Sequence, residues 1–282
     1  MRIDSHQHFW KFDPDQYSWI GEGMQLLARD WLYADLEREL VRAELDGCVA
    51  VQARQSLEEN RFLLNIAAQC ERVRGVVGWV DLCAEDVEEQ LALPAADPLF
   101  KGVRHVVQDE PDDDFVLRDD FMNGIARLAQ FDLTYDLLTH PRQLPAAVRL
   151  VDEFPDQPFV LDHISKPPIR ARQMRPWSDD LRELAQRPNV MCKVSGLVTE
   201  AEWGAWNADD FRPYLDLVFE AFGEDRLMFG SDWPVCRLSA HYSEVYALLS
   251  DYAAQGYEAA RAKLFGLNAA RFYRIAAYTA PR

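Results

Sequence analysis

Short β-rich runs alternate with longer helical patterns along the chain, and this alternation constrains the fold more than any other feature. Eight runs have the Val, Ile, Leu, Phe and Met content of buried strands. They cover residues 2–8, 47–53, 74–82, 101–107, 133–139, 158–163, 189–195 and 226–232. Strands that alternate with helices form parallel sheets, and eight such units close a barrel. The sequence therefore predicts an α/β fold, specifically a (β/α)8 TIM barrel.

Apolar residues at helical spacing fill the intervals between these strands. The predicted helices are 33–46, 58–71, 84–92, 117–131, 141–153, 178–187, 209–222 and 241–254. A doubly wound open sheet is the structural alternative, but no G-x-G-x-x-G or G-K-[ST] motif follows a strand to supply its phosphate site. No Gly/Ser-rich linker divides the 282 residues. We therefore expect one domain over 1–282.

Composition and charge narrow the class of function. The chain is 49% hydrophobic and 27% charged, which suits a globular protein with a large core. Its formal net charge of -17 disfavours nucleic acid and anionic membranes as partners. The N-terminus lacks the apolar core of a signal peptide, no apolar run has the length of a membrane span, and the five cysteines form no C-x-x-C pair. We expect a cytoplasmic location and reduced thiols.

Two histidines one residue apart, His6 and His8, close the first predicted strand, and Asp232 ends the last one. Side chains alternate in a strand, so the two imidazoles should project from the same face, a few ångströms apart. The alternative is a purely structural role, in which the two histidines form a polar strand end and hydrogen-bond to neighbouring carbonyls. A His-x-His on the first strand and an Asp on the last instead suggest a hydrolase.

Other polar residues also gather where the predicted strands end, and active sites of such barrels lie at the C-terminal ends of the strands. The strand interiors are mostly apolar, so this gathering is not random. The residues concerned are Arg104, His105, His140, Asp162, His163, Lys193 and Ser195.

Several stretches in barrel order resemble the amidohydrolase superfamily, and within it the branch that hydrolyses sugar lactones such as L-fucono- and L-rhamnonolactone. They are Asp4-Ser5-His6-Gln7-His8-Phe9-Trp10, Gly102-Val103-Arg104-His105, Asp162-His163-Ile164-Ser165-Lys166-Pro167-Pro168, Lys193-Val194-Ser195-Gly196 and Gly230-Ser231-Asp232-Trp233-Pro234. The H-x-H with the last-strand Asp points to the superfamily, whereas D-H-x-x-K-P-P and S-D-W-P point to the branch.

The resemblance bears on the metal. Binuclear members carry a carboxylated lysine at the end of strand 4 or 5, but this chain has Arg104-His105 and Thr139-His140 at those places. A two-metal site is therefore disfavoured. His6, His8 and Asp232, with His163 nearby, could hold one divalent metal, zinc being the best match to such ligands. Some lactonases of this branch work without metal, so the same residues could bind substrate directly.

The expected reaction opens an aldonolactone, such as L-fuconolactone, to the aldonic acid. No serine or cysteine lies in a nucleophile elbow, so direct attack by water is favoured, with Asp232 as general base. Polarisation of the carbonyl is assigned to His6, His8 and His163, or to one zinc. Further substrate-binding candidates are Arg104, His105 and Lys166, with Trp10 and Trp233 as sugar-stacking rings.

Three alternatives remain open from the residues, one for the tryptophans and two for the function. Trp10, Trp177, Trp203, Trp206 and Trp233 follow predicted strands and could anchor long loops instead of stacking on a sugar. An amidohydrolase-type, metal-dependent decarboxylase of an aromatic or unsaturated acid would share the fold and the H-x-H. A binding protein without catalysis is the third class. The sequence does not indicate the ring size of the lactone or an oligomeric state.

Overall fold

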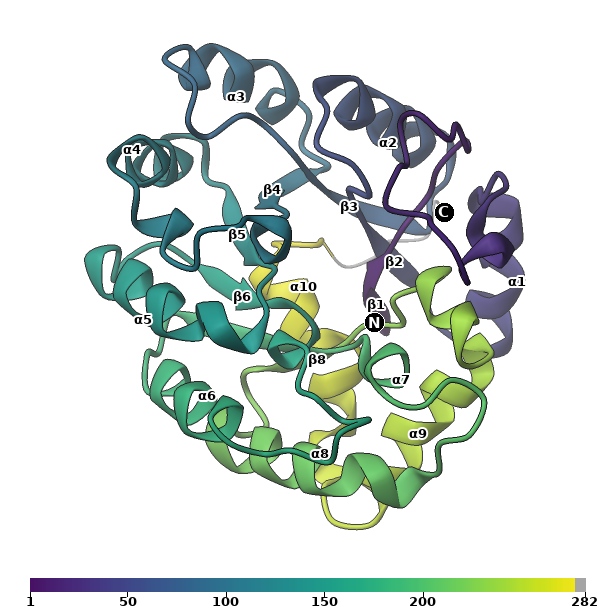
Figure 1. Ribbon diagram of the computed structural model, residues 1–282. Helices are drawn as coiled ribbons and strands as arrows, with labels where there is room; N and C mark the ends of the chain where they lie inside the picture. The colour runs from purple at the N-terminus through teal and green to yellow at the C-terminus, as the bar shows by residue number, and fades with distance from the viewer. Residues whose placement is uncertain (277–282) are drawn as a thin grey trace.

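A computed structural model describes residues 1–276, with eight parallel strands at its centre (Figure 1). Each strand pairs with the next along the chain, in the order β1 to β8. Their bounds are β1 (Ile3–Gln7), β2 (Gly47–Val51), β3 (Val73–Gly78), β4 (Phe100–His105), β5 (Thr134–Leu137), β6 (Phe159–Leu161), β7 (Val190–Val194) and β8 (Leu227–Phe229). The predicted (β/α)8 barrel is confirmed, and every predicted strand overlaps an observed one.

The barrel closes between β1 and the residues just after β8. The Asp232 amide donates to the His6 carbonyl at 2.8 Å, and the His8 amide donates to the Trp233 carbonyl at 2.7 Å. Because these bonds join the two ends of the sheet, they also bring Asp232 next to both histidines. The same two hydrogen bonds therefore close the barrel and bring the site residues together.

Helices surround the strands, and the eight predicted ones all overlap observed helices. The bounds are α1 (Tyr33–Arg42), α2 (Leu57–Gln69), α3 (Val87–Ala95), α4 (Asp119–Leu128), α5 (Leu144–Glu153), α6 (Trp177–Ala185), α7 (Leu197–Glu200), α8 (Ala208–Phe222), α9 (Tyr242–Ala254) and α10 (Asn268–Phe272). The predicted helix 33–46 is too long, because Glu44 adopts a left-handed φ of 53° and turns the chain toward β2. Short α7 and α10 were not predicted.

The core has two parts. Inside the barrel, Val49, Val51 and Val77 pack with residues of α10, while a larger cluster fills the space between strands and helices. Helix α1 shows how the outer layer forms, since Leu36 and Leu40 lie one turn apart and are both fully buried. Each such side chain contributes about 1.5–3 kcal/mol by burial.

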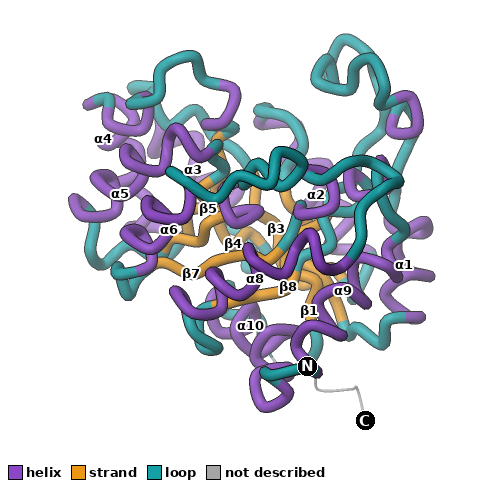
Figure 2. The backbone as a smooth tube through the Cα atoms, turned by 60° about the horizontal axis from the view of Figure 1, so that its bottom comes forward, coloured by secondary structure: helices purple, strands orange, loops and turns teal. Residues whose placement is uncertain are grey.

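The two ends of the barrel differ. The N-terminus and α10 lie at one end, and long loops cover the other (Figure 2). The loop between β1 and α1 is the longest, and Trp10 and Trp31 tie it together through two backbone hydrogen bonds of 2.9 Å. No helix in residues 1–276 combines the length and apolar character needed to cross a bilayer.

Candidate active site

His6 in β1 and His8, just after that strand, point to one place at the loop end of the barrel. Their Nε2 atoms are 3.2 Å apart, as the alternation of side chains predicts. A β-bulge sets this phase, because Asp4 pairs with Cys48 whereas Gln7 pairs with Ala50. The extra residue lets His6 face the barrel interior while Asp4 faces the helices.

The imidazoles of His8 and His163 are each oriented by a hydrogen bond at Nδ1. His8 Nδ1 lies 2.8 Å from the Val51 carbonyl, so Nδ1 carries the proton and Nε2 presents its lone pair to the site. His163, just after β6, has Nδ1 2.9 Å from Ser195 Oγ. These contacts leave the Nε2 atoms free to meet a ligand.

Two glycines make room for the imidazoles. A Cβ at Gly196 would lie 2.6 Å from His163 Nδ1, and a Cβ at Gly230 would lie 2.6 Å from His6 Cβ. Gly196 also has a φ of 67°, which favours glycine. The S-G and G-S-D motifs therefore have a steric cause.

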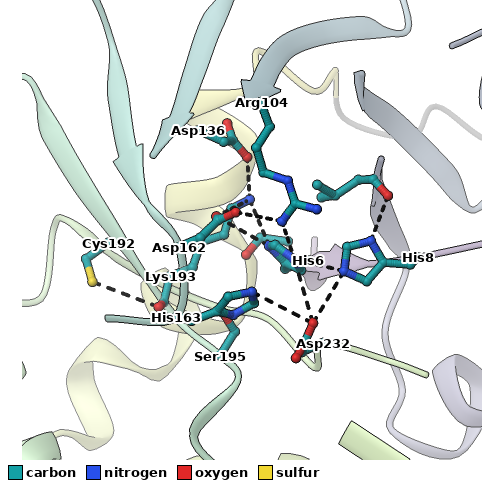
Figure 3. Close-up of polar contacts among 12 residues, drawn as sticks. His6, His8, Arg104, Asp136, Asp162, His163, Cys192, Lys193, Ser195 and Asp232 are labelled. Atoms are coloured by element: carbon teal, nitrogen blue, oxygen red, sulfur yellow. Dashed lines mark hydrogen bonds and ion pairs between the residues drawn. The ribbon is translucent and has the colours of Figure 1, made fainter. Parts of the chain in front are cut away.

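Asp232 completes a convergent set of four atoms (Figure 3). Its Oδ1 lies 3.3 Å from His8 Nε2, 3.8 Å from His6 Nε2 and 3.9 Å from His163 Nε2. All four side chains are buried. Asp232 reaches this position through a left-handed backbone, with a φ of 56°.

This arrangement fits a divalent metal. Neighbouring ligands of a tetrahedral zinc lie about 3.3 Å apart when the bonds are ~2.0–2.1 Å. The His6–His8 and His8–Asp232 separations match that value, and the His6–Asp232 separation of 3.8 Å is longer. The fixed proton on His8 Nδ1 also directs a lone pair toward the Asp232 carboxylate, an arrangement that a cation between them would stabilise. His6, His8 and Asp232 therefore form one candidate ligand set in the described residues, and His6, Asp162 and His163 form another that shares His6.

A layer of buried charges lies beneath these residues, inside the barrel. Arg104 Nη1 lies 3.1 Å from Asp162 Oδ2 and 3.3 Å from His6 Nε2. Lys193 Nζ lies 3.0 Å from Asp162 Oδ1, 2.5 Å from Asp136 Oδ2 and 3.2 Å from His6 Nδ1. The two cations and two carboxylates balance each other. His6 thus rests on a fixed, internally neutralised network.

Two members of this region were missed in the sequence. Asp136 sits within a predicted strand, where a single acid in an apolar run was the available signal. Tyr273 follows α10 and donates its hydroxyl to Asp136 Oδ2 at 2.8 Å. It lies after the last predicted helix, and no sequence pattern pointed from it to the site.

The protonation states follow from burial and neighbours. Burial lowers the pKa of His163 to about 4 and that of His6 well below its usual value, so both are neutral near pH 7. Burial alone would raise the pKa of Asp232, but the nearby imidazoles, foremost His163, hold it well below the usual value because they become protonated in the acid range where the carboxyl titrates. Near pH 7, His6 and His163 are therefore neutral imidazoles beside an ionised carboxylate.

The segment after β6 is strained. His163, Ile164, Ser165 and Lys166 all have left-handed backbones, with φ values of 48–59°. Each costs about 1–2 kcal/mol relative to a right-handed turn. The Trp177 indole holds the segment by donating to the Ile164 carbonyl at 2.7 Å. Such strain is characteristic of functional sites, and here it orients both His163 and Lys166.

The side chains of three predicted substrate-binding residues are occupied by contacts with other parts of the protein. His105 follows Arg104 in β4 and so points the opposite way, where its ring stacks on Phe115 and its Nε2 is 2.7 Å from Glu110. Trp10 is fully buried and donates to the Arg29 carbonyl at 2.9 Å. Trp233 is 1% exposed and packs edge-on against Trp31. A substrate contact by these three residues stays a prediction that their packing does not support.

Of the three remaining loop tryptophans, two anchor loops and one is exposed. Trp177 is buried and Trp206 donates to Ser239 Oγ at 3.1 Å, so both anchor loops. Trp203 is 40% exposed. Its ring is the one most accessible among the five predicted tryptophans.

Comparisons with known proteins agree over nearly the whole chain. A family model described as amidohydrolase matches residues 3–275. A curated L-fucono-1,5-lactonase of Burkholderia multivorans (strain ATCC 17616 / 249) is 43% identical, covering 98% of this chain and 96% of the relative. A second L-fucono-1,5-lactonase, from Burkholderia ambifaria, is 39% identical with the same coverage.

A solved structure is similarly close. The crystal structure of an amidohydrolase from Burkholderia multivorans with bound zinc superposes with a TM-score of 0.94 at 43% identity. The match covers 98% of this chain and all of that chain. The overall fold and the sequence thus relate the protein to the same group.

Proposed function

We propose, from the premise that the chain belongs to the amidohydrolase family, that this enzyme is a lactonase that opens a sugar lactone to its aldonic acid. L-Fucono-1,5-lactone is the first substrate to test, because the two curated relatives carry that activity in their names. The observation that carries the proposal is the convergence of three imidazole Nε2 atoms on Asp232 Oδ1 at the loop end of the barrel.

In the proposed reaction, water attacks the lactone carbonyl carbon and Asp232 accepts the proton that the water releases. The ring carbon–oxygen bond then breaks, and the ring oxygen takes up a proton to become a hydroxyl. A low pKa makes Asp232 a weak base but keeps it ionised through mildly acid pH. Its burial beside imidazoles fixes where the water must lie.

Positive charge and hydrogen-bond donors would stabilise the oxyanion that develops on the carbonyl oxygen. Arg104 is the cation on the Nε2 side of His6, with its Nη1 3.3 Å from that atom. The neutral His163 contributes a polar contact from the opposite wall. Lys166, at the end of the strained turn, is the candidate for holding the hydroxyls or the product carboxylate.

A single divalent ion is the proposed cofactor, with His6, His8 and Asp232 as its ligands. When bound, such an ion would polarise the carbonyl and lower the pKa of the attacking water. The related structure with zinc supports this choice of metal.

A panel of aldonolactones tests the function. Proton release in weakly buffered indicator solution should report hydrolysis of fucono-, rhamnono- or galactonolactone well above the spontaneous rate. Aromatic and unsaturated carboxylic acids, assayed for carbon dioxide release, form the matched arm for the decarboxylase alternative. Turnover of an acid without turnover of any lactone would refute the proposal.

A further inference from the structure

A chain of buried contacts leads from the closed end of the barrel to the first histidine of the site. Tyr273 follows α10, at the end opposite the loops (Figure 2). Its hydroxyl donates to Asp136 Oδ2 at 2.8 Å, and the same oxygen lies 2.5 Å from Lys193 Nζ. Lys193 Nζ in turn lies 3.2 Å from His6 Nδ1 (Figure 3). All four side chains have no exposed surface.

The Tyr273 hydroxyl is important because Asp136 has few other partners. Asp136 Oδ1 has no hydrogen-bond partner among the described residues, so Oδ2 makes both polar contacts of this carboxylate. Lys193 Nζ also lies 5.5 Å from the centre of the Tyr273 ring. Tyr273 therefore touches both members of the ion pair that supports His6.

We propose that Tyr273 is a positioning residue for lactone hydrolysis: its hydroxyl keeps the Asp136 carboxylate ionised and in place, and this carboxylate holds the Lys193 ammonium against His6. The inference rests on the proposed function for its activity readout. It assigns a role to Tyr273, the residue that follows α10.

The electrostatics of Asp136 make the role measurable. Burial raises its pKa to about 6, although Lys193 on β7 and the Tyr273 hydroxyl both act to lower it. Asp162, just after β6, acts in the other direction, and Arg104 on β4 is the register partner of Asp136. Loss of the hydroxyl should therefore raise the pKa of Asp136 further, by about one pH unit for one hydrogen bond to a buried carboxylate.

The direction of the pH effect on kcat follows from the ionisation of Asp136. Asp136 is ionised above its pKa, so activity that depends on this carboxylate is lost as pH falls through that value. In Tyr273→Phe, the acid side of the kcat profile should move upward by about one pH unit. KM should change little, because Tyr273 is linked to His6 through Asp136 and Lys193. A residue that served packing alone would leave the profile where it is.

Tyr252→Phe is the matched control. Tyr252 also donates to an aspartate, Asp216 Oδ1 at 2.7 Å, but this pair joins α9 to α8 on the outside of the barrel. Its loss should reduce the melting temperature without moving the pH profile. A Tyr273→Phe enzyme whose profile and kcat equal those of the wild type would overturn the proposal.

A second readout needs no activity. The hydroxyl stabilises only the ionised carboxylate, so the stability advantage of the wild type over Tyr273→Phe should grow as pH rises through about 6 to 7. A difference in unfolding free energy that is constant with pH would also overturn the proposal. If the wild type opens no lactone while the pH-dependent difference is present, the proposed function fails and the effect of Tyr273 on Asp136 stands. Should Tyr273→Phe not fold, Asp136→Asn replaces it, and wild-type kcat in that variant would overturn the proposal.

Discussion

Replacing Asp232 with asparagine tests the proposed general base most directly. The amide is nearly isosteric with the carboxylate, and the backbone bond from Asp232 to the His6 carbonyl does not depend on the side chain. An amide cannot accept the proton of the attacking water, so kcat should fall by about a hundredfold to ten-thousandfold. That loss corresponds to about 3–5 kcal/mol of transition-state stabilisation.

The fold of the variant should survive for a structural reason. The imidazoles of His6 and His163 are neutral near pH 7, so removing the charge of Asp232 breaks no buried ion pair with them. KM should therefore change little, and the melting temperature should stay near that of the wild type. Circular dichroism and thermal unfolding are measured on the same sample as kcat, together with its metal content.

The matched control is Asp216→Asn, which removes a carboxylate from the outer layer, where it accepts from Tyr252. This variant should keep its kcat. A well-folded Asp232→Asn enzyme with wild-type kcat on the best lactone would remove Asp232 from the mechanism. A loss of kcat that tracks a loss of metal would assign the effect to ligation rather than to base catalysis.

Three further predictions concern the metal and the shape of the site. Elemental analysis should find at most one divalent ion per chain, because both candidate ligand groups, His6–His8–Asp232 and His6–Asp162–His163, include His6; two tightly held ions would contradict this expectation. Gly196→Ala should lower kcat at least tenfold, since the new Cβ would lie 2.6 Å from His163 Nδ1; Gly204→Ala has a similar φ of 70° but open space around it, and should keep kcat. Trp177→Phe should lower kcat severalfold and stability by about 1 kcal/mol through loss of the bond to Ile164; unchanged kinetics would show that this bond does not position His163.

The strands could be predicted because their apolar runs are distinct. The ends of the strands could not be predicted, because the polar motifs continue past the last hydrogen bonds between strands. The run 226–232, for example, contains β8 only at Leu227–Phe229, and Gly230 to Asp232 form the turn that closes the barrel. The short α10 was missed because five residues are too few to show helical periodicity. Boundaries therefore depend on tertiary contacts that local pattern does not contain.

The sequence predicted the site residues that lie at the C-terminal ends of strands. His6, His8, His163 and Asp232 converge because barrel geometry brings the C-terminal ends of strands together. His105 was placed with Arg104 by adjacency in sequence, although neighbours in a strand point to opposite faces. The buried partners of Asp136 come from distant elements, so only the folded chain could reveal them.

The layer of buried charges supports His6 from inside the barrel. Four consecutive strands, or the residue that follows one of them, each place one charge inside the barrel. These charges are Arg104 on β4, Asp136 on β5, Asp162 after β6 and Lys193 on β7. An unpaired charge at this depth would cost several kcal/mol, so the set is tolerable only when complete. Because the complete set is neutral, it can fix His6 without placing a net charge beneath the site, and the loop ends around β1 and β8 remain free to carry the residues of the chemistry.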